Sequence, residues 1–257
     1  MILDEILSHK RVELQRARAA APLEDLKKRA ADAPEVRPFA KVLRHCDRLG
    51  LIAEVKRASP SAGVIREDFD PVGIAQSFEA AGADCLSVLT DECYFQGKLE
   101  YVAWIREATS LPILRKDFTI SEYHVYEARA AGADAVLLLA AALSQQEIAD
   151  FASLAADLGM AALIETHTEA EMFIAKQIEA ELIGINSRDL QTFITDIAVV
   201  DRLSKLAPSG STLVAESGIK TRADVDRVRT AGAHAILVGE TLMRSDDIGA
   251  TVRRLIG

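Results

Sequence analysis

The sequence lacks any hydrophobic run that would cross a membrane and any start typical of a secreted protein. None of its apolar stretches approaches the roughly 20 residues that span a bilayer. Residues 1–10 include Asp4 and Glu5 and contain no basic region followed by an apolar stretch, so no secretory signal is readable. We therefore expect a cytoplasmic protein without membrane partners.

Cysteine and histidine are scarce and are not spaced as metal ligands. Cys46, Cys85 and Cys93 are an odd number of cysteines without CxxC spacing, which argues against a disulfide framework and a structural zinc site. The five histidines form no HxH or HExxH pair, so we expect no catalytic metal.

Positive charge is also in deficit. The chain has 30 Lys and Arg residues against 39 Asp and Glu residues, a net charge of −9, which disfavours binding to nucleic acid or anionic membranes. An anionic substrate stays possible, because the local field in a cleft can oppose the net charge. The 257 residues fit one large domain or two small ones.

A four-residue string that recurs along the chain is the clearest feature that is present. Ala-Gly-Ala-Asp at 81–84 returns at 131–134 and, with histidine last, at 231–234. Each copy follows a helix-like stretch and precedes an apolar run, where glycine is expected to end the helix in the left-handed conformation. The glycines lie 50 and then 100 residues apart. If a βα unit takes about 25 residues, eight units need about 200, the size of a TIM barrel.

Short apolar runs lead to the same architecture. Amphipathic segments such as 145–158 and 222–231, long enough for crossover helices, separate runs that predict strands. The predicted strands are 51–56, 85–89, 112–116, 135–139, 161–165, 182–186, 212–216 and 235–238. The competing fold is a doubly wound open sheet, but the near-uniform repeat and the polar strand ends favour a single (β/α)₈ barrel.

Residues 1–48 precede the barrel that we expect over 49–257. An apolar stripe formed by Leu3, Ile6 and Leu7 and extended by Val12 and Leu14 predicts a helix. Pro22 and Pro34 divide the segment into two or three short helices. Because it is too short for a good core of its own, we expect a helical extension packed on the barrel.

Charged and polar side chains cluster where the predicted strands end. Such residues are often merely solvated, but their joint occurrence at the end of a barrel that carries active sites is harder to dismiss. Buried charges would need to pair with one another or with a ligand. The residues are Glu54, Lys56, Lys116, Glu165, Asn186, Arg188 and Glu216.

Two glycine-containing turns predict a phosphate site. The loops after the seventh and eighth strands of such barrels frequently bind phosphate through backbone N–H groups. Here they contain Ser217 with Gly218, and Gly239 with Thr241. Either turn alone is an ordinary βα connection, whereas two in successive units at the expected place are moderate support. The loop at 59–63 after the first strand is by itself only a turn signal.

Taken together, these motifs resemble one family, the indole-3-glycerol-phosphate synthases of tryptophan biosynthesis. The matching strings appear in family order over nearly the whole chain, and the Arg-Pro-Phe segment at 37–39 also looks like the family's. The strings are EVKRASPSAG at 54–63, SVLTD at 87–91, YFQG at 94–97, LRKDF at 114–118, GINSRDL at 184–190, ESGI at 216–219 and VGETLM at 238–243.

The resemblance implies ring closure of 1-(2-carboxyphenylamino)-1-deoxyribulose 5-phosphate to indole-3-glycerol phosphate, with release of carbon dioxide and water and without a cofactor. It implies that Lys116 is the general acid for the ketone oxygen. Lys56 would contact the substrate carboxylate, and an acid role has also been given to it. Glu165 would assist loss of the hydroxyl group, and Glu54 would tune the lysines.

The remaining implied roles concern binding of the substrate. Asn186, Arg188 and Glu216 would position it, and Phe95 and Phe118 would wall its aromatic ring. The implied phosphate site consists of Ser59, Ser217, Gly218, Gly239, Glu240 and Thr241, where Thr241 stands in place of a serine common among relatives.

Two alternatives are weighed against this interpretation, another phosphate-binding barrel enzyme and a protein without catalytic activity. An isomerase on the same fold would need a cysteine or aspartate acid–base pair at strand ends, and Cys85 and Cys93 are not placed for it. A catalytically dead, metabolite-binding barrel would have lost Lys116 or Glu165, and both are present. A monomer and a homodimer are equally compatible with the sequence.

Overall fold

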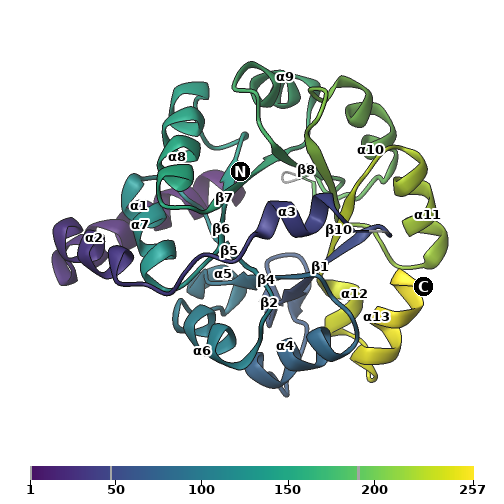
Figure 1. The fold of residues 1–257 in the computed structure, drawn as a ribbon, viewed down its shortest axis with the longest axis horizontal. Coiled ribbons are helices and arrows are strands. Elements are labelled where there is room, and N and C mark those ends of the chain that lie inside the picture. Colours follow the sequence, from purple (N-terminus) through teal and green to yellow (C-terminus); the bar gives the residue numbers. More distant parts are fainter. Residues whose placement is uncertain (1, 47, 190–191) are drawn as a thin grey trace.

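The computed structural model describes residues 2–46, 48–189 and 192–257. Its centre is a closed barrel of eight parallel strands (Figure 1). The strands are β1 (Gly50–Val55), β4 (Cys85–Leu89), β5 (Ile113–Lys116), β6 (Ala135–Leu139), β7 (Ala161–Thr166), β8 (Leu182–Asn186), β9 (Thr212–Glu216) and β10 (Ala235–Val238). The predicted barrel is therefore confirmed, with strand ends within one residue of the prediction. Leu190, part of one quoted string, lies outside the described residues.

Helices surround the barrel as Figure 1 shows. They are α4 (Pro71–Ala80), α6 (Glu100–Ala108), α7 (Glu122–Ala130), α8 (Gln145–Asp157), α9 (Glu169–Gln177), α10 (Ala198–Leu203), the 3₁₀ helix η1 (Ser204–Leu206), α11 (Arg222–Thr230) and α13 (Ile248–Ile256). Two short helices, α5 (Glu92–Phe95) and α12 (Glu240–Met243), lie in loops after strands. The loop after β1 folds into an antiparallel hairpin of β2 (Ala58–Ser59) and β3 (Gly63–Val64), which the sequence indicated only as a turn.

The repeated string ends helices as predicted. Gly82, Gly132 and Gly232 have φ angles of 97°, 90° and 102°, the left-handed conformation in which glycine is unstrained. The side chain of the last residue of each copy also accepts a hydrogen bond from a backbone N–H group at the beginning of the preceding barrel strand. These hydrogen bonds join Leu51 to Asp84 (2.8 Å), Ile113 to Asp134 (2.8 Å) and Leu213 to His234 (3.0 Å).

Alternation along the strands places apolar side chains beneath the charged strand ends. Ile52, Leu114, Leu163 and Val214 are fully buried and pack together, because residues i and i+2 share one face of a strand. The residues two positions further on are Glu54, Lys116, Glu165 and Glu216. Val55 packs in the outer cluster, away from the interior, as its position predicts. The charged groups therefore stand on an apolar layer at the carboxyl ends of the strands.

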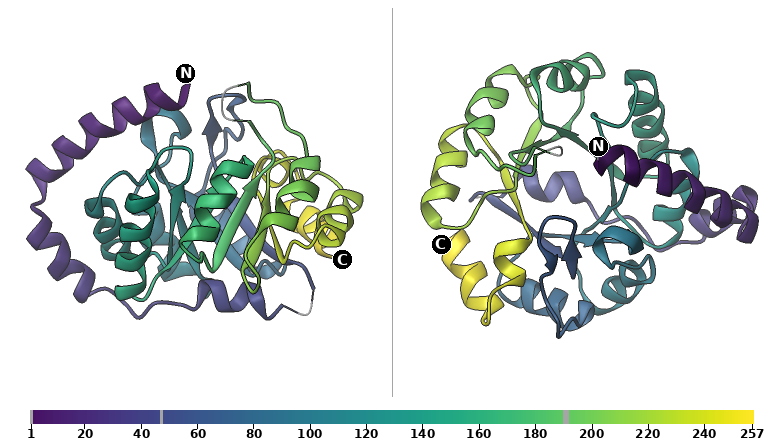
Figure 2. Two further views of the ribbon diagram at one scale, coloured as in Figure 1. Left: turned by 90° about the horizontal axis from the view of Figure 1, so that it is seen from above. Right: turned by 180° about the vertical axis from the view of Figure 1, so that it is seen from behind.

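The first three helices lead from one end of the barrel past its side to the other end, where the third lies across the barrel (Figure 1 and Figure 2). They are α1 (Ile2–Ala20), α2 (Leu23–Ala31) and α3 (Phe39–Arg44). Phe39 and Leu43 of α3 pack against the interior layer and close the barrel at the amino ends of its strands. The helix α1 is longer than the short helices predicted, and Val12, expected in its apolar stripe, is 46% exposed. Within the described residues, no helix has the length and apolarity needed to cross a membrane.

Candidate active site

A pocket of about 870 Å³ opens at the carboxyl ends of the barrel strands. Every residue that the sequence suggested for the site lines it. These residues are Glu54, Lys56, Ser59, Phe95, Lys116, Phe118, Glu165, Asn186, Arg188, Glu216, Ser217, Gly218, Gly239, Glu240 and Thr241. Side chains from five barrel strands, β1, β5, β7, β8 and β9, thus meet in one space, as expected when parallel strands end at the same edge.

Lys116 lies between two buried carboxylates. Its Nζ is 2.7 Å from Glu165 Oε2 and 3.2 Å from Glu216 Oε2. Asn186 donates a hydrogen bond of 2.9 Å to Glu165 Oε1, so both oxygens of that carboxylate have partners. Two glutamates that are each 2% exposed therefore share one ammonium group. Burying these charges costs free energy of desolvation, which the pairing of the ammonium group with the two carboxylates offsets.

The two glutamates differ in the direction of their pKa shifts. Burial and the nearby Glu165 charge raise the pKa of Glu216, although Lys116 opposes this. For Glu165, burial is outweighed by the charges of Lys116 and His167, which hold its pKa below the usual value. Burial likewise disfavours the Lys116 ammonium, but the charges of Glu165, Glu216 and Glu54 raise its pKa. The cluster thus separates an ionised carboxylate from one that holds a proton more readily.

A second lysine–glutamate pair lies beside this cluster. Lys56 Nζ is 2.6 Å from Glu54 Oε1, and the Ser87 hydroxyl donates to Glu54 Oε2 at 3.5 Å. Two positions without a Cβ make room for these carboxylates: a Cβ at Gly239 would overlap Glu54 Oε1, and one at Gly184 would overlap Glu216 Oε1.

Arg188 connects three loops over the pocket. Its guanidinium lies 3.1 Å from Glu240 Oε2 and donates hydrogen bonds to the hydroxyls of Ser61 (3.1 Å) and Thr195 (3.4 Å). On the opposite wall Phe95 and Phe118 face each other, with ring centroids 6.3 Å apart. Their rings form an apolar wall.

The two predicted phosphate loops differ in backbone conformation, and the first is left-handed at two consecutive residues. Ser217 and Gly218 have φ angles of 64° and 81°, which turn consecutive peptide groups in a way that suits anion binding. Gly239 caps α12, and the first N–H groups of a helix have no intrahelical acceptor. The Thr241 hydroxyl donates to the Ile219 carbonyl at 2.8 Å. Because this hydroxyl joins the two loops, Thr241 would reach a ligand through its backbone N–H.

Sequence reasoning missed His167 and Glu171, which extend the cluster behind the pocket. His167 Nε2 lies 3.3 Å from Glu165 Oε1, and Nδ1 lies 3.1 Å from Glu171 Oε2. A metal-ligand search could not find them, because no metal spacing is involved. The available signal was the position of His167, two residues beyond Glu165 and four before Glu171.

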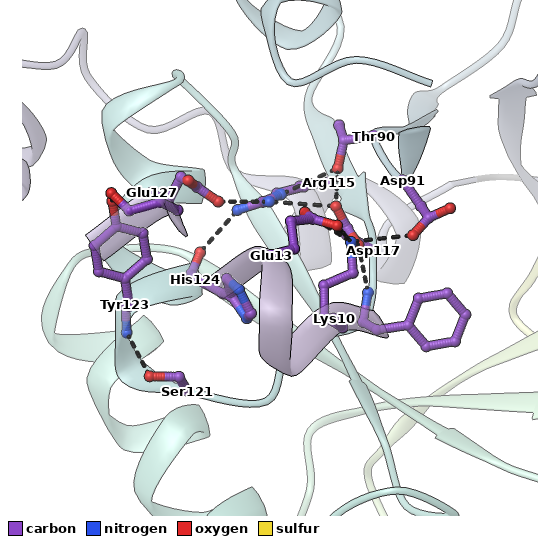
Figure 3. Close-up of polar contacts among 12 residues, drawn as sticks. Lys10, Glu13, Thr90, Asp91, Arg115, Asp117, Ser121, Tyr123, His124 and Glu127 are labelled. Atoms are coloured by element: carbon purple, nitrogen blue, oxygen red, sulfur yellow. Dashed lines mark hydrogen bonds and ion pairs between the residues drawn. The ribbon is translucent and has the colours of Figure 1, made fainter. Parts of the chain in front are cut away.

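Sequence reasoning also missed Lys10 of α1, which joins two loops of the pocket (Figure 3). Lys10 Nζ is 2.8 Å from Asp117 Oδ1 and 3.0 Å from Asp91 Oδ2. Asp117 accepts the N–H of Phe118 (2.8 Å), and Asp91 caps α5, the helix that carries Phe95. The available signal was that Lys10 falls on the buried face of α1, at helical spacing from Ile6 and Leu7.

The arrangement provides ammonium groups, carboxylates of different proton affinity and backbone donors around one pocket. The described residues contain no group of three or more His, Cys, Asp or Glu side chains placed to hold a metal ion. The side chains present suit acid–base chemistry on an anionic ligand.

The sequence of this chain is similar to those of known proteins. A sequence model of the family described as indole-3-glycerol phosphate synthase matches residues 3–255. An indole-3-glycerol phosphate synthase of Neisseria gonorrhoeae is 51% identical over 258 residues, which cover 99% of this chain and 98% of the relative. One from Rhodospirillum rubrum is 48% identical over 260 residues and covers 100% and 99%.

Solved structures at low identity share the fold. A 3-hexulose-6-phosphate synthase from Salmonella typhimurium superposes with a TM-score of 0.65 at 13% identity, covering 80% of this chain and 96% of that one. An N-acetylmannosamine-6-phosphate 2-epimerase from Clostridium perfringens gives 0.61 at 14% identity, covering 81% and 93%. At such identities the likeness extends to the barrel alone.

Proposed function

The chain belongs to the indole-3-glycerol phosphate synthase family, and we propose which of its side chains carry out that reaction. The activity is the decarboxylating, dehydrating ring closure of 1-(2-carboxyphenylamino)-1-deoxyribulose 5-phosphate in tryptophan biosynthesis. The products are indole-3-glycerol phosphate, carbon dioxide and water. The chain is thus a lyase with a phosphorylated small-molecule substrate.

Lys116 is the general acid in our proposal. Ring closure builds negative charge on the ketone oxygen, and a nearby ammonium group both stabilises that charge and donates a proton. The contacts with Glu165 and Glu216 support this role, because they keep the lysine protonated and fix its Nζ at the base of the pocket.

Lys56 binds the carboxylate that leaves as carbon dioxide. Its ammonium lies in the pocket at 2.6 Å from Glu54, which holds the long side chain in place and balances its charge. The substrate carboxylate approaches the Lys56 ammonium, and Glu54 orients that lysine rather than reacting itself.

Glu165 takes part in the second half of the reaction, where a hydroxyl group leaves and the ring becomes aromatic. An ionised carboxylate is needed to accept a proton, and the low pKa of Glu165 supports that state. Asn186 holds Glu165 Oε1. Glu216, whose pKa is raised, shares Lys116 and positions the substrate beside it.

The two ends of the substrate lie on opposite walls. Phe95 and Phe118 contact the aromatic ring, and Arg188 reaches over the sugar chain from the other side. The phosphate lies against the loops that contain Ser217, Gly218 and Gly239, with Ser59, Glu240 and Thr241 completing its surroundings. Glu240 contributes through its backbone, because its carboxylate already contacts Arg188 and Arg244.

The observation that carries this assignment is the position of Lys116 between two buried glutamates beneath the phosphate loops. The test is to mix the purified protein with the substrate in the presence of EDTA and to follow indole fluorescence. We expect fluorescence to rise at a rate proportional to protein concentration. If folded protein produces no indole-3-glycerol phosphate under these conditions, the assignment is wrong.

A further inference from the structure

Behind Glu165, the connection from β7 to α9 holds a histidine in a fixed orientation. Thr168 caps α9 by accepting the N–H of Glu171 at 3.2 Å. The Glu171 carboxylate turns back and accepts the backbone N–H of His167 at 2.8 Å, while its Oε2 lies 3.1 Å from the ring Nδ1. One carboxylate thus fixes both the backbone and the ring of His167.

The other ring nitrogen faces the pocket cluster. His167 Nε2 is buried and, within the described residues, makes no hydrogen bond of regular geometry. The polar group that it faces is Glu165 Oε1 at 3.3 Å. The side chain is only 10% exposed, so water does not offer an easy alternative partner.

The ionisable groups form a row whose charges alternate. Glu171, His167, Glu165 and Lys116 follow one another at ion-pair distance, and Glu216 completes the row. Lys116 is a single ammonium group in contact with two carboxylates. Glu54 adds a third negative charge nearby, which Lys56 pairs. Because Glu216 competes with Glu165 for this ammonium, a second positive group beside Glu165 favours its ionised form.

We propose that His167, oriented by Glu171, is a positioning residue that keeps Glu165 ionised and turned toward Lys116. This inference rests on the proposed role of Glu165 in proton transfer. His167 does not line the pocket, so it acts through Glu165 rather than on the substrate.

The protonation of the row supports this assignment. Although burial opposes it, the adjacent carboxylates of Glu165 and Glu171 raise the pKa of His167 to about 10. The imidazole is then cationic throughout the neutral range. The charged groups that face Glu165 from the surrounding elements are Lys116 on β5, Glu216 on β9 and His167, with Glu54 on β1 beyond Lys116.

Two substitutions of the histidine separate its charge from its hydrogen bonding. His167→Asn places an amide near the Nδ1 position and leaves nothing at Nε2, whereas His167→Gln reaches the Nε2 position with a neutral donor. We expect His167→Asn to lower kcat about tenfold at pH 7, where Glu165 is still ionised, because the carboxylate is no longer held toward Lys116 and a displacement of about 1 Å in such a site can cost about a hundredfold. The acidic limb of the kcat profile should also move up by about one pH unit. The limb moves up because Glu165 without its cation binds a proton more readily.

The expected KM for His167→Asn stays within about threefold of the wild-type value, because ground-state binding does not pass through Glu165. His167→Gln should recover part of kcat but keep a shifted limb. Glu171→Gln should shift the limb in the same direction by a smaller amount. Glu147→Gln is the matched control, because Glu147 holds the same place in the cap of α8 and lies on the surface; its kcat profile should match that of the wild type.

The decisive comparison includes Glu165→Gln. Suppose that Glu165→Gln is inactive. The inference is then overturned if the acidic limb of His167→Asn coincides with that of the wild type and its kcat stays within about twofold. A near-normal kcat for Glu165→Gln instead removes the proposed role of Glu165. Should His167→Asn fail to fold, Glu171→Gln decides alone: an unshifted limb overturns the inference and a shifted one supports it.

Discussion

Lys10 of α1 and Asp117, the residue that follows Lys116, form an ion pair of 2.8 Å in which both side chains are almost fully buried. Burial disfavours the Lys10 ammonium, but Asp117 and Asp91 outweigh it and raise its pKa. The first helix is thereby connected to the loop that immediately follows the proposed general acid.

Replacing Lys10 with methionine should destabilise the protein by about 3–5 kcal/mol, the usual cost of removing one partner of a buried ion pair. Asp91 would remain buried without its cation, and of its two cations Asp117 would keep only Arg115. Urea unfolding followed by circular dichroism measures the change. Lys27→Met is the control, because the Lys27–Glu24 pair is exposed and such pairs contribute below about 1 kcal/mol. Equal effects of the two substitutions would contradict the prediction.

Lys116→Ala should lower kcat by about two orders of magnitude or more, the usual scale for a lost general acid. Steady-state assays by indole fluorescence measure this, with thermal unfolding as a check on the fold. Lys98→Ala removes an exposed lysine and should leave kcat unchanged. A near-normal kcat for Lys116→Ala would assign the acid to another group.

Gly184→Ala should reduce kcat more than it changes KM. The new Cβ would overlap Glu216 Oε1 and push that carboxylate away from Lys116, and a displacement of about 1 Å in such a site can cost about a hundredfold. Gly249→Ala in α13 is the control, because its Cβ would meet only flexible parts of Arg253 and Asp247. If Gly184→Ala retains the wild-type kcat, the close approach of Glu216 does not matter for catalysis.

Ser217 tests the phosphate loop. Leucine at this left-handed position would strain the backbone and crowd the loop, so we expect Ser217→Leu to raise KM about tenfold with a smaller effect on kcat, as for lost ground-state binding. Ser217→Gly keeps the conformation, and its KM should stay within about threefold. An unchanged KM in Ser217→Leu would place the phosphate elsewhere.

His124 should make stability depend on pH. Burial and the charge of Arg115 lower its pKa from 6.5 to about 3, so the unfolded chain binds a proton that the folded protein does not. This contribution is complete above pH 6.5 and is lost as the pH falls toward about 3, at up to about 1.4 kcal/mol per pH unit.

Asparagine at position 124 would retain an acceptor for the Ile120 N–H, which now donates to His124 Nδ1 at 3.2 Å. We expect His124→Asn to lose less stability than the wild type between pH 7 and pH 4.5 in urea titrations. His45→Asn, at an exposed histidine, should follow the wild-type curve. Parallel pH curves for His124→Asn and the wild type would refute the prediction.

The barrel could be predicted from sequence because its signals are local. Each apolar run and each copy of the repeat lies within a few residues, and strand alternation then fixes that Glu54 and Lys116 point inward. The chemical content of the pocket followed from residues at strand ends. Their specific roles came from the family resemblance and not from periodicity.

The contacts that were missed join segments far apart or use ordinary residue types. Lys10 lies 81 residues before Asp91 and 107 before Asp117, and an apolar pattern gives no reason to bury a lysine. Instead the stripe was extended to Val12, which is exposed. His167 was set aside with the other scattered histidines, because a single histidine has no pattern until its neighbours are known.

The repeated strings help to fix the register of neighbouring strands through their last residues, Asp84, Asp134 and His234. Each binds the N–H at the beginning of the preceding barrel strand, at the end of the barrel opposite the pocket. A slip by one residue would break that bond and turn every side chain of the strand to its other face. These hydrogen bonds, at the far end of the strands, therefore help to determine where Glu54, Lys116 and Glu216 lie in the pocket and that their side chains face its interior.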